Sequence, residues 1–180
     1  MSTGCYSQWA APVMLVLCET GLRTQEALRL DWQRGVIVVE HSGRRDGPRT
    51  KTGKSRRVGM RPAVRDALLA IWEKRDRPDT GAVFLNKRGK PYADTRQTGG
   101  SPLASAHRTA CRKARIDGFR IHDWRHHFAV QFLKRGGNLR ALCQIAGWSG
   151  MRMVARYAVF EQDDLDEIMA RTARAEQRAT

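Results

Sequence analysis

Acidic residues are scarce in this sequence. It contains 18 Asp and Glu against 33 Lys and Arg, so its 180 residues carry a formal net charge of +15 at pH 7. Hydrophobic residues make up 41% of the chain, which is enough to build a core and argues against a disordered chain. We therefore expect a single globular domain whose partner is a polyanion such as nucleic acid.

Long hydrophobic runs are also absent. The longest, Trp9 to Cys18, has ten residues, whereas a transmembrane helix needs roughly 20. No Lys or Arg precedes this run and no small-residue cleavage site follows it, which argues against a secretory signal. These absences exclude a transmembrane helix and predict a cytoplasmic protein, with the nucleus as the alternative compartment, and no membrane partner.

Cysteines are few and widely spaced. The four of them, Cys5, Cys18, Cys111 and Cys143, form no C-x-x-C pair. Neither a zinc site nor a disulfide framework is therefore indicated. We expect these cysteines to be buried thiols.

The apolar spacing predicts a mainly helical protein with a small antiparallel sheet, an α+β fold. Val36–Glu40 and a stretch around Arg56–Met60 have the character of short strands, and a loop rich in Gly, Pro and charged residues joins them as a hairpin. Apolar residues at steps of three and four indicate helices elsewhere. The predicted helices cover 8–20, a stretch from about 24, 62–72, 101–115, 123–135, 138–146, 150–158 and 162–177.

Local signals mark three of the helix starts. Pro12 stands early in the first predicted helix, where a missing N–H costs little. Ser101 followed by Pro102 looks like a cap with proline at the first helical position. Asp123 is a candidate cap for the helix that follows it, because its carboxylate can accept hydrogen bonds from backbone amides.

Basic residues concentrate between positions 41 and 61, which hold eight of them against one acid. This predicted hairpin is a candidate surface for contact with the DNA backbone. Besides Lys51, the candidate DNA contacts are Arg44, Arg45, Arg49, Lys54, Arg56 and Arg57.

The last twenty residues reverse the sign of the charge, with six acids against three arginines. Leu165, Ile168 and Met169 recur there at steps of three and four and predict an apolar stripe. Because the acids would repel phosphate, we expect residues 161–180 to form a helical tail that contacts protein and acts as an assembly element. The alternative is a helix that packs back on its own domain.

A histidine and an arginine, His122 and Arg125, stand three residues apart at a predicted helix start, where an anion is favoured. Such a pair on its own is more often a surface histidine with a solvated arginine. It gains weight because Arg23, Lys51 and Tyr157 occur around it in a fixed order: TGLR, KTGK, HDWR and AGWS, then the tyrosine.

These ordered motifs resemble the tyrosine recombinases, also called the phage integrase family, and specifically their C-terminal catalytic domain. The resemblance runs from about Ser7 to Phe160. It implies the corresponding fold and six catalytic residues. They are Arg23, Lys51 with Lys54 as the less favoured choice, His122, Arg125, Trp148 and Tyr157.

Other positions match or depart from the family pattern. His126 and Phe128 match the usual surroundings of the H-x-x-R motif, whereas Trp148 replaces the commoner histidine and Gly59 stands where proline is usual. The family normally has a helical core-binding domain before this one. Because 180 residues leave no room for it, we expect a fragment or a truncated member.

The chemistry of the motifs is that of phosphodiester cleavage. Arg23 and Arg125 can hold the two nonbridging oxygens, and Tyr157 can attack phosphorus. Lys51 is the expected general acid for the leaving oxygen, and His122 can accept the phenolic proton or hold the phosphate. No metal or nucleotide cofactor is required. The products are a covalent 3′-phosphotyrosine and a free 5′-hydroxyl.

The resemblance implies site-specific recombination of double-stranded DNA by a homo-tetramer whose members exchange C-terminal segments. A type IB topoisomerase and a non-catalytic DNA-binding module are the alternatives. At single positions, Tyr157 and Trp148 could instead be packing residues. Glu26 could either orient the residues of the site or lie on an ordinary solvated face.

Overall fold

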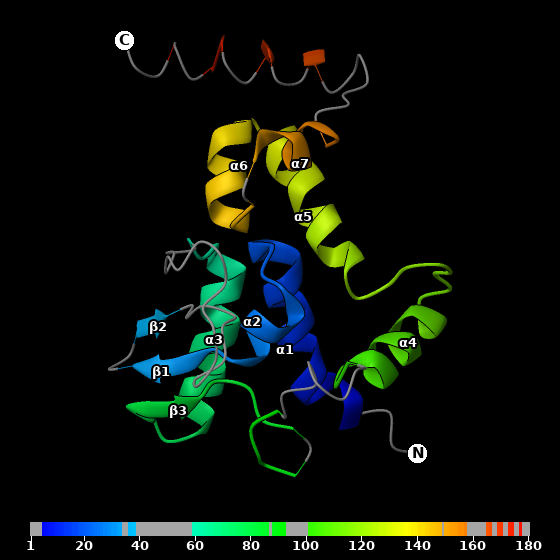
Figure 1. Cartoon of the computed structure of the whole chain (residues 1–180). Coiled ribbons are helices and arrows are strands. Elements are labelled where there is room, and N and C mark those ends of the chain that lie inside the picture. The colour runs from blue at the N-terminus through cyan, green and yellow to red at the C-terminus, as the bar shows by residue number, and fades with distance from the viewer. Residues whose placement is uncertain are drawn as a thin grey trace.

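The secondary structure is given by a computed structural model, which describes residues 5–33, 36–38, 59–86, 88–92, 101–148, 150–157, 165–166, 169–170, 173–174 and 177. Helices dominate the described part, and three short strands accompany them (Figure 1). The helices are α1 (Cys5–Thr20), α2 (Thr24–Leu28), α3 (Pro62–Lys74), α4 (Ala104–Lys113), α5 (Asp123–Lys134), α6 (Leu139–Ala146) and α7 (Met151–Ala155). The strands are β1 (Asp31–Gln33), β2 (Val36–Val38) and β3 (Thr80–Ala82).

The three strands form one antiparallel sheet in the order β2-β1-β3. Trp32 of β1 is paired with Ile37 on one side and Gly81 on the other. The predicted strand at Val36–Glu40 is thus confirmed over β2, but its partner here is β1, which the sequence did not indicate. Most of the predicted partner around Arg56–Met60 lies outside the described residues, and its last two residues are not in a strand.

Several helix starts differ from the prediction. Pro12 lies inside α1, because the helix already begins at Cys5. The Ser101 hydroxyl accepts a hydrogen bond from the Leu103 amide at 3.3 Å, so it closes a turn before α4. Asp123 does not cap α5; its Oδ2 accepts from the Arg120 amide at 2.7 Å and stabilises the preceding turn.

The buried side chains form two core clusters. The first comes from α1, α2, α3, the sheet and the start of α4, with Val13, Leu17, Val64 and Leu103 at its centre. The second comes from α5, α6 and α7, which lie together above α1 and the sheet in Figure 1. Its buried members are Phe128, Ala129, Leu133, Leu142, Ala146, Val154 and Tyr157.

Gly21 is the point where the two clusters meet. It follows α1 with φ +63°, a conformation that favours glycine. A Cβ at this position would lie 2.3 Å from Cδ1 of Phe128 in α5. The glycine is therefore required both by its backbone angle and by the close approach of the Phe128 ring.

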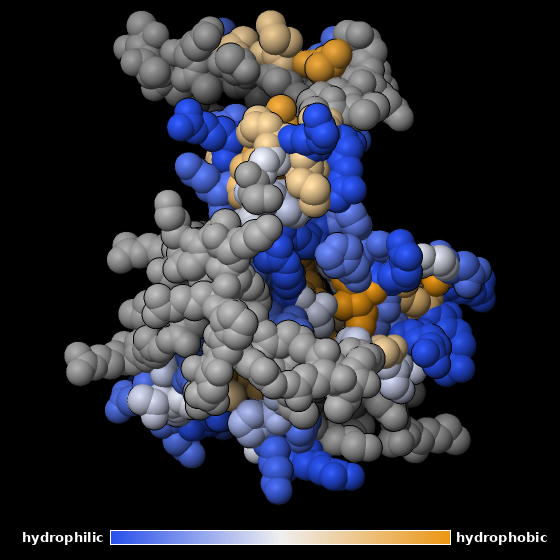
Figure 2. Space-filling model, viewed as in Figure 1, coloured by the Kyte–Doolittle hydropathy of each residue, from blue (hydrophilic) through white to orange (hydrophobic). Residues whose placement is uncertain are grey.

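Hydrophilic side chains cover most of the described part of the face seen in Figure 2. The few large apolar side chains exposed among the described residues include Met151, Met153, Leu165 and Met169. None of the helices within the described residues is both long and apolar enough to cross a membrane.

Candidate active site

Arg125 is the central side chain of the candidate site. Its position near the start of α5 points the guanidinium toward the junction of the two core clusters, where only 3% of the residue is exposed. Nη1 donates to the Gly21 carbonyl at 2.7 Å, and Nη2 donates to the Ala146 carbonyl at 2.5 Å. These bonds attach α5 to the end of α1 and to the last turn of α6.

Trp148 contacts both Arg125 and Tyr157. The α6 helix ends at Gly147, whose left-handed conformation (φ 65°) turns the chain so that the Trp148 amide donates back to Cys143. The Arg125 guanidinium carbon lies 4.7 Å from the Trp148 ring centroid, a cation–π contact. The Tyr157 ring stacks on the same indole at 5.4 Å with an interplanar angle of 14°.

Tyr157 itself is held in the turn that follows α7. Its amide donates to the Val154 carbonyl at 2.9 Å, and only 8% of the residue is exposed. The phenol hydroxyl is hydrogen-bonded to Nδ1 of His126, and the guanidinium carbon of Arg156 lies 5.0 Å from the phenol centroid. The tyrosine side chain is thus held by contacts to its ring and by a hydrogen bond to its hydroxyl.

Arg23 reaches the site from the start of α2. Its guanidinium pairs with Glu26 Oε1 at 3.0 Å, and Glu26 Oε2 accepts from the Arg23 amide at 2.9 Å. The Arg23 side chain is 44% exposed, whereas that of Glu26 is 1% exposed. The solvated-face alternative for Glu26 is therefore wrong: the carboxylate is buried and orients the arginine.

The pKa of His122 reflects the charges of both arginines of the candidate site. Its pKa is lowered, first by burial and then by the positive charges of His126, Arg125 and Arg23, while Asp123 opposes the shift. Both arginines are therefore close enough to this imidazole to influence its charge. Such a gathering of positive groups disfavours one more cation and favours an anion such as phosphate.

The structure thus brings most of the predicted site residues into one region: Arg23, Glu26, His122, Arg125, Trp148 and Tyr157. The basic candidates lie outside the described residues. They are Lys51, Arg44, Arg45, Arg49, Lys54, Arg56 and Arg57.

His126 is the side chain at this site whose part sequence reasoning missed. The sequence marked it only as a match to the surroundings of a motif. The available signal was its spacing, because His126 follows His122, the N-cap of α5, by four residues and so lies about one helical turn further along the same side. Their rings lie 5.1 Å apart in an edge-to-face arrangement.

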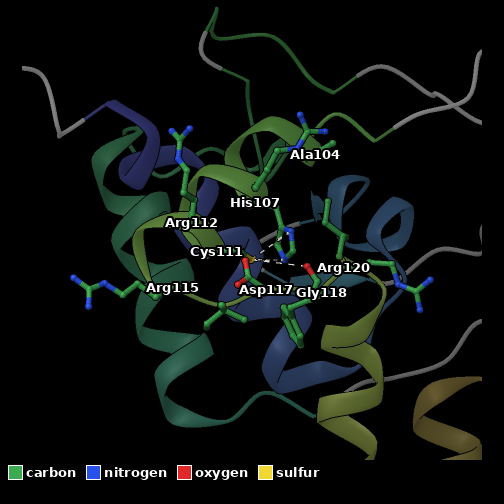
Figure 3. A pocket seen from close by; sticks show the side chains of 12 residues that line it. Ala104, His107, Cys111, Arg112, Arg115, Asp117, Gly118 and Arg120 are labelled. Carbon is green, nitrogen blue, oxygen red and sulfur yellow. Dashed lines mark hydrogen bonds between the residues drawn. The ribbon is translucent and has the colours of Figure 1, made fainter.

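A separate cavity of about 560 Å³ lies beside α4 and the loop after it (Figure 3). Cys111 Sγ lies 3.6 Å from Nε2 of His107 inside it. Figure 3 shows the side chains of Arg112, Arg115 and Arg120 extending away from the cavity, so they do not converge on one point. No group of three His, Cys, Asp or Glu residues suited to a metal occurs among the described residues.

The model of the phage integrase family matches residues 1–163 of this chain. The tyrosine recombinase XerC of Lactobacillus delbrueckii subsp. bulgaricus is 30% identical over 143 residues, covering 75% of this chain and 45% of the relative. The integrase of Salmonella phage P22 is 27% identical over 156 residues, covering 82% of this chain and 38% of the relative. The chain therefore spans less than half the length of these relatives.

Solved structures show the same fold. The XerA recombinase superposes with a TM-score of 0.64 at 22% identity, covering 96% of this chain and 62% of that one. A Tn1549 transposon integrase in complex with a circular intermediate DNA gives 0.64 at 22% identity, covering 99% and 60%. The fold and the family match agree: the chain belongs to the phage integrase family, the tyrosine recombinases.

Proposed function

We propose that this chain is the catalytic domain of a site-specific DNA recombinase, which cuts and rejoins DNA through a covalent 3′-phosphotyrosine. The observation that carries the proposal is the contact series from Arg125 through Trp148 to Tyr157. It puts a candidate nucleophile beside a cation that binds phosphate well. Family membership supports the same reaction.

In the proposed reaction Tyr157 is the nucleophile and two arginines stabilise the phosphate. Charge builds on the nonbridging oxygens as the phenol oxygen attacks, and donors fixed in advance lower the energy of that state. Arg125 is anchored by its bonds to two backbone carbonyls, and Arg23 is oriented by Glu26. Both therefore approach the phosphate with little rearrangement.

The remaining site residues take supporting roles in the proposal. His122 holds a phosphate oxygen by a hydrogen bond, and the indole of Trp148 packs against the site and can donate one more. Lys51 gives a proton to the leaving 5′-oxygen. No metal or nucleotide cofactor takes part, because arginines supply the charge and the phosphotyrosine keeps the energy of the broken bond for religation.

The proposed partner is double-stranded DNA. The net charge of +15 supports a polyanionic partner. The proposed phosphate contacts are the basic residues of the segment 41–61: Arg44, Arg45, Arg49, Lys54, Arg56 and Arg57. Such contacts fix the register of the protein on the duplex without reading its sequence.

We also propose assembly into a homo-tetramer on DNA through residues 161–180. The exposed fractions of 42% for Leu165 and 70% for Met169 support an apolar stripe that needs a partner surface. Truncation before Glu161 tests this. Cleavage of a single DNA site should persist while association on DNA, measured by sedimentation, is lost; unfolding of the truncated protein would instead support packing on its own domain.

The decisive experiment for the reaction is covalent capture. A nicked duplex pool with a randomised core traps the cleaved state, because the released strand cannot return for religation. We expect wild-type protein to give a protein–DNA adduct on a denaturing gel and Tyr157→Phe to give none while still binding DNA. An adduct with the Phe variant would show that Tyr157 is not the nucleophile. The absence of an adduct with wild type would favour a non-catalytic DNA-binding module.

A relaxation assay separates the two enzyme classes. Both a recombinase and a type IB topoisomerase form the adduct, because they share the tyrosine chemistry. Relaxation of supercoiled plasmid of any sequence would favour the topoisomerase. Adducts enriched in one sequence, with no general relaxation, would support the recombinase.

A further inference from the structure

We propose that His126 is a catalytic residue of this reaction, whose Nδ1 accepts the Tyr157 proton as the phenol attacks phosphorus. The inference rests on the proposed function, because it assigns a role within that reaction. It gives the proton of the nucleophile to His126, one turn after the histidine of the H-x-x-R motif.

The hydrogen bond between the Tyr157 hydroxyl and His126 Nδ1 carries the inference. A general base must lie within hydrogen-bond reach of the proton that it removes. Among the described residues, His126 is the hydrogen-bond partner of this hydroxyl. With the imidazole hydrogen on Nε2, Nδ1 is the acceptor and the phenol is the donor, which is the direction that proton transfer needs.

The surroundings hold both rings in place for this transfer. The Tyr157 and His126 rings lie 5.5 Å apart at 42°, and the phenol also stacks on Trp148. His126 belongs to α5, the same helix that holds Arg125 through its bonds to Gly21 and Ala146. The base and the phosphate-binding arginine are therefore fixed relative to each other by one helix.

His122 is less suited to this step. No hydrogen bond joins it to Tyr157 within the part of the chain that the structure describes; it meets His126 edge to face. Burial and the charges of His126, Arg125 and Arg23 also lower its pKa, which disfavours uptake of a proton. The two histidines therefore divide the work, with His122 at the phosphate and His126 at the phenol.

The step balances without a co-reactant. A lone pair of the Tyr157 oxygen forms the new bond to phosphorus while its proton passes to His126 Nδ1. The bond from phosphorus to the 5′-oxygen breaks, and its electron pair leaves with that oxygen, which takes a proton from the general acid. Religation reverses each transfer, so His126 returns the proton to the phenol.

The first test compares His126→Gln with His127→Gln. Glutamine can still hydrogen-bond the phenol but cannot take its proton, and His127 is an exposed neighbour outside the site. Adduct formation on the nicked, randomised-core duplex is timed with both variants and wild type. We expect His126→Gln to slow adduct formation by about 10²- to 10³-fold at unchanged DNA affinity. We expect His127→Gln to match wild type.

A substrate with sulfur in place of the bridging 5′-oxygen shows which end of the reaction His126 serves. A thiolate leaves without a proton, so this substrate relieves a missing general acid but not a missing base. The His126→Gln defect should therefore persist on it, whereas a Lys51→Ala defect should shrink. A His126→Gln defect that disappears on this substrate, or a rate equal to that of His127→Gln, would overturn the proposal.

A measurement without DNA tests the contact itself. Protein labelled with 3-fluorotyrosine gives a ¹⁹F resonance for Tyr157, which is assigned by its loss in Tyr157→Phe. This resonance should lie at a different position in His126→Gln than in wild type, because the group that contacts the phenol has changed. It should keep the wild-type position in His127→Gln; equal positions in all three proteins would refute the contact. The other charged and titratable groups around His126 are the same in both variants: His122 just before α5, Asp123 and Arg125 on α5, and Arg156 beside the phenol.

The two readouts separate failure of this role from failure of the proposed function. If wild type forms an adduct and His126→Gln forms it equally fast, the reaction stands and the role of His126 is refuted. If wild type forms no adduct, the proposed function fails and the catalytic role fails with it, even where the ¹⁹F measurement supports the contact.

Discussion

The guanidinium of Arg125 donates a hydrogen bond to the carbonyl of Gly21, 104 residues earlier in the chain, at 2.7 Å. The same side chain also reaches the Ala146 carbonyl. A residue proposed to bind phosphate is thus also a structural link between α1, α5 and α6. This double role separates its expected mutational behaviour from that of a surface arginine.

Arg125→Ala should therefore unfold more easily, besides losing cleavage. Two buried carbonyls lose a charged donor, and the indole of Trp148 loses its cation, so we expect a loss of about 3 kcal/mol in the free energy of unfolding. Urea denaturation measures it. The control is Arg120→Ala, whose side chain is 83% exposed, and which should change stability by less than about 0.5 kcal/mol. Equal effects would contradict the link.

Gly21→Ala should be strongly destabilising because of Phe128. The matched control is Gly118→Ala, since Gly118 has a similar φ of +71° with no atom within 4 Å of the added Cβ. Both variants put alanine at a positive φ, which costs about 1 kcal/mol. Only in Gly21→Ala does the added Cβ also clash with the Phe128 ring. We expect Gly21→Ala to be worse by about 2 kcal/mol or more in denaturant melts. Adding Phe128→Leu should recover part of that difference.

Stability should fall at mildly acidic pH because of His107. Burial lowers its pKa, with partial opposition from Asp123, so the unfolded chain binds the proton more readily than the folded one. The contribution is complete above the unfolded pKa of about 6.5 and is lost as pH falls toward the lower folded pKa. Urea melts across this range should show a flatter pH dependence for His107→Gln than for wild type. The exposed-site control His127→Gln should keep the wild-type slope.

Salt should weaken DNA binding through the basic segment. On duplex DNA the log of affinity falls with the log of salt by about 0.9 for each phosphate contacted. Replacing Arg44, Arg45 and Arg57 by Ala should therefore reduce this slope by about 2 to 3. The control replaces Arg171, Arg174 and Arg178, an equal loss of charge in the C-terminal segment, and should leave the slope unchanged. If the C-terminal replacements reduced the slope and the replacements in the basic segment did not, the DNA contact would lie in the C-terminal segment.

Elements with a strong apolar period were predictable from the sequence. The helix predicted at 62–72 is α3, and that predicted at 138–146 is α6, because each has apolar residues on one face. β1 was not predictable, because Trp32 stands between polar Asp31 and Gln33 and only its neighbours on both sides make it a strand. Asp123 failed as a cap because its carboxylate has a nearer donor in the preceding turn.

The residue types of the candidate site were visible in the sequence, whereas their contacts were not. Arg125 lies next to Trp148 only because α6 ends in a left-handed glycine, and its carbonyl partners are 104 and 21 residues away. The burial of Glu26 likewise depends on tertiary packing. His126 acquires its contact with Tyr157 across 31 residues, which no local pattern encodes.

The position of Arg125 between the two core clusters makes the candidate site depend on the docking of those clusters. Helices can form early from local contacts, but the carbonyls of Gly21 and Ala146 reach the guanidinium only when both clusters have docked. The proposed covalent activity should consequently return during refolding no earlier than the docking of the two clusters. Its recovery would thus report on that docking, whereas the far-ultraviolet signal reports on the helices alone.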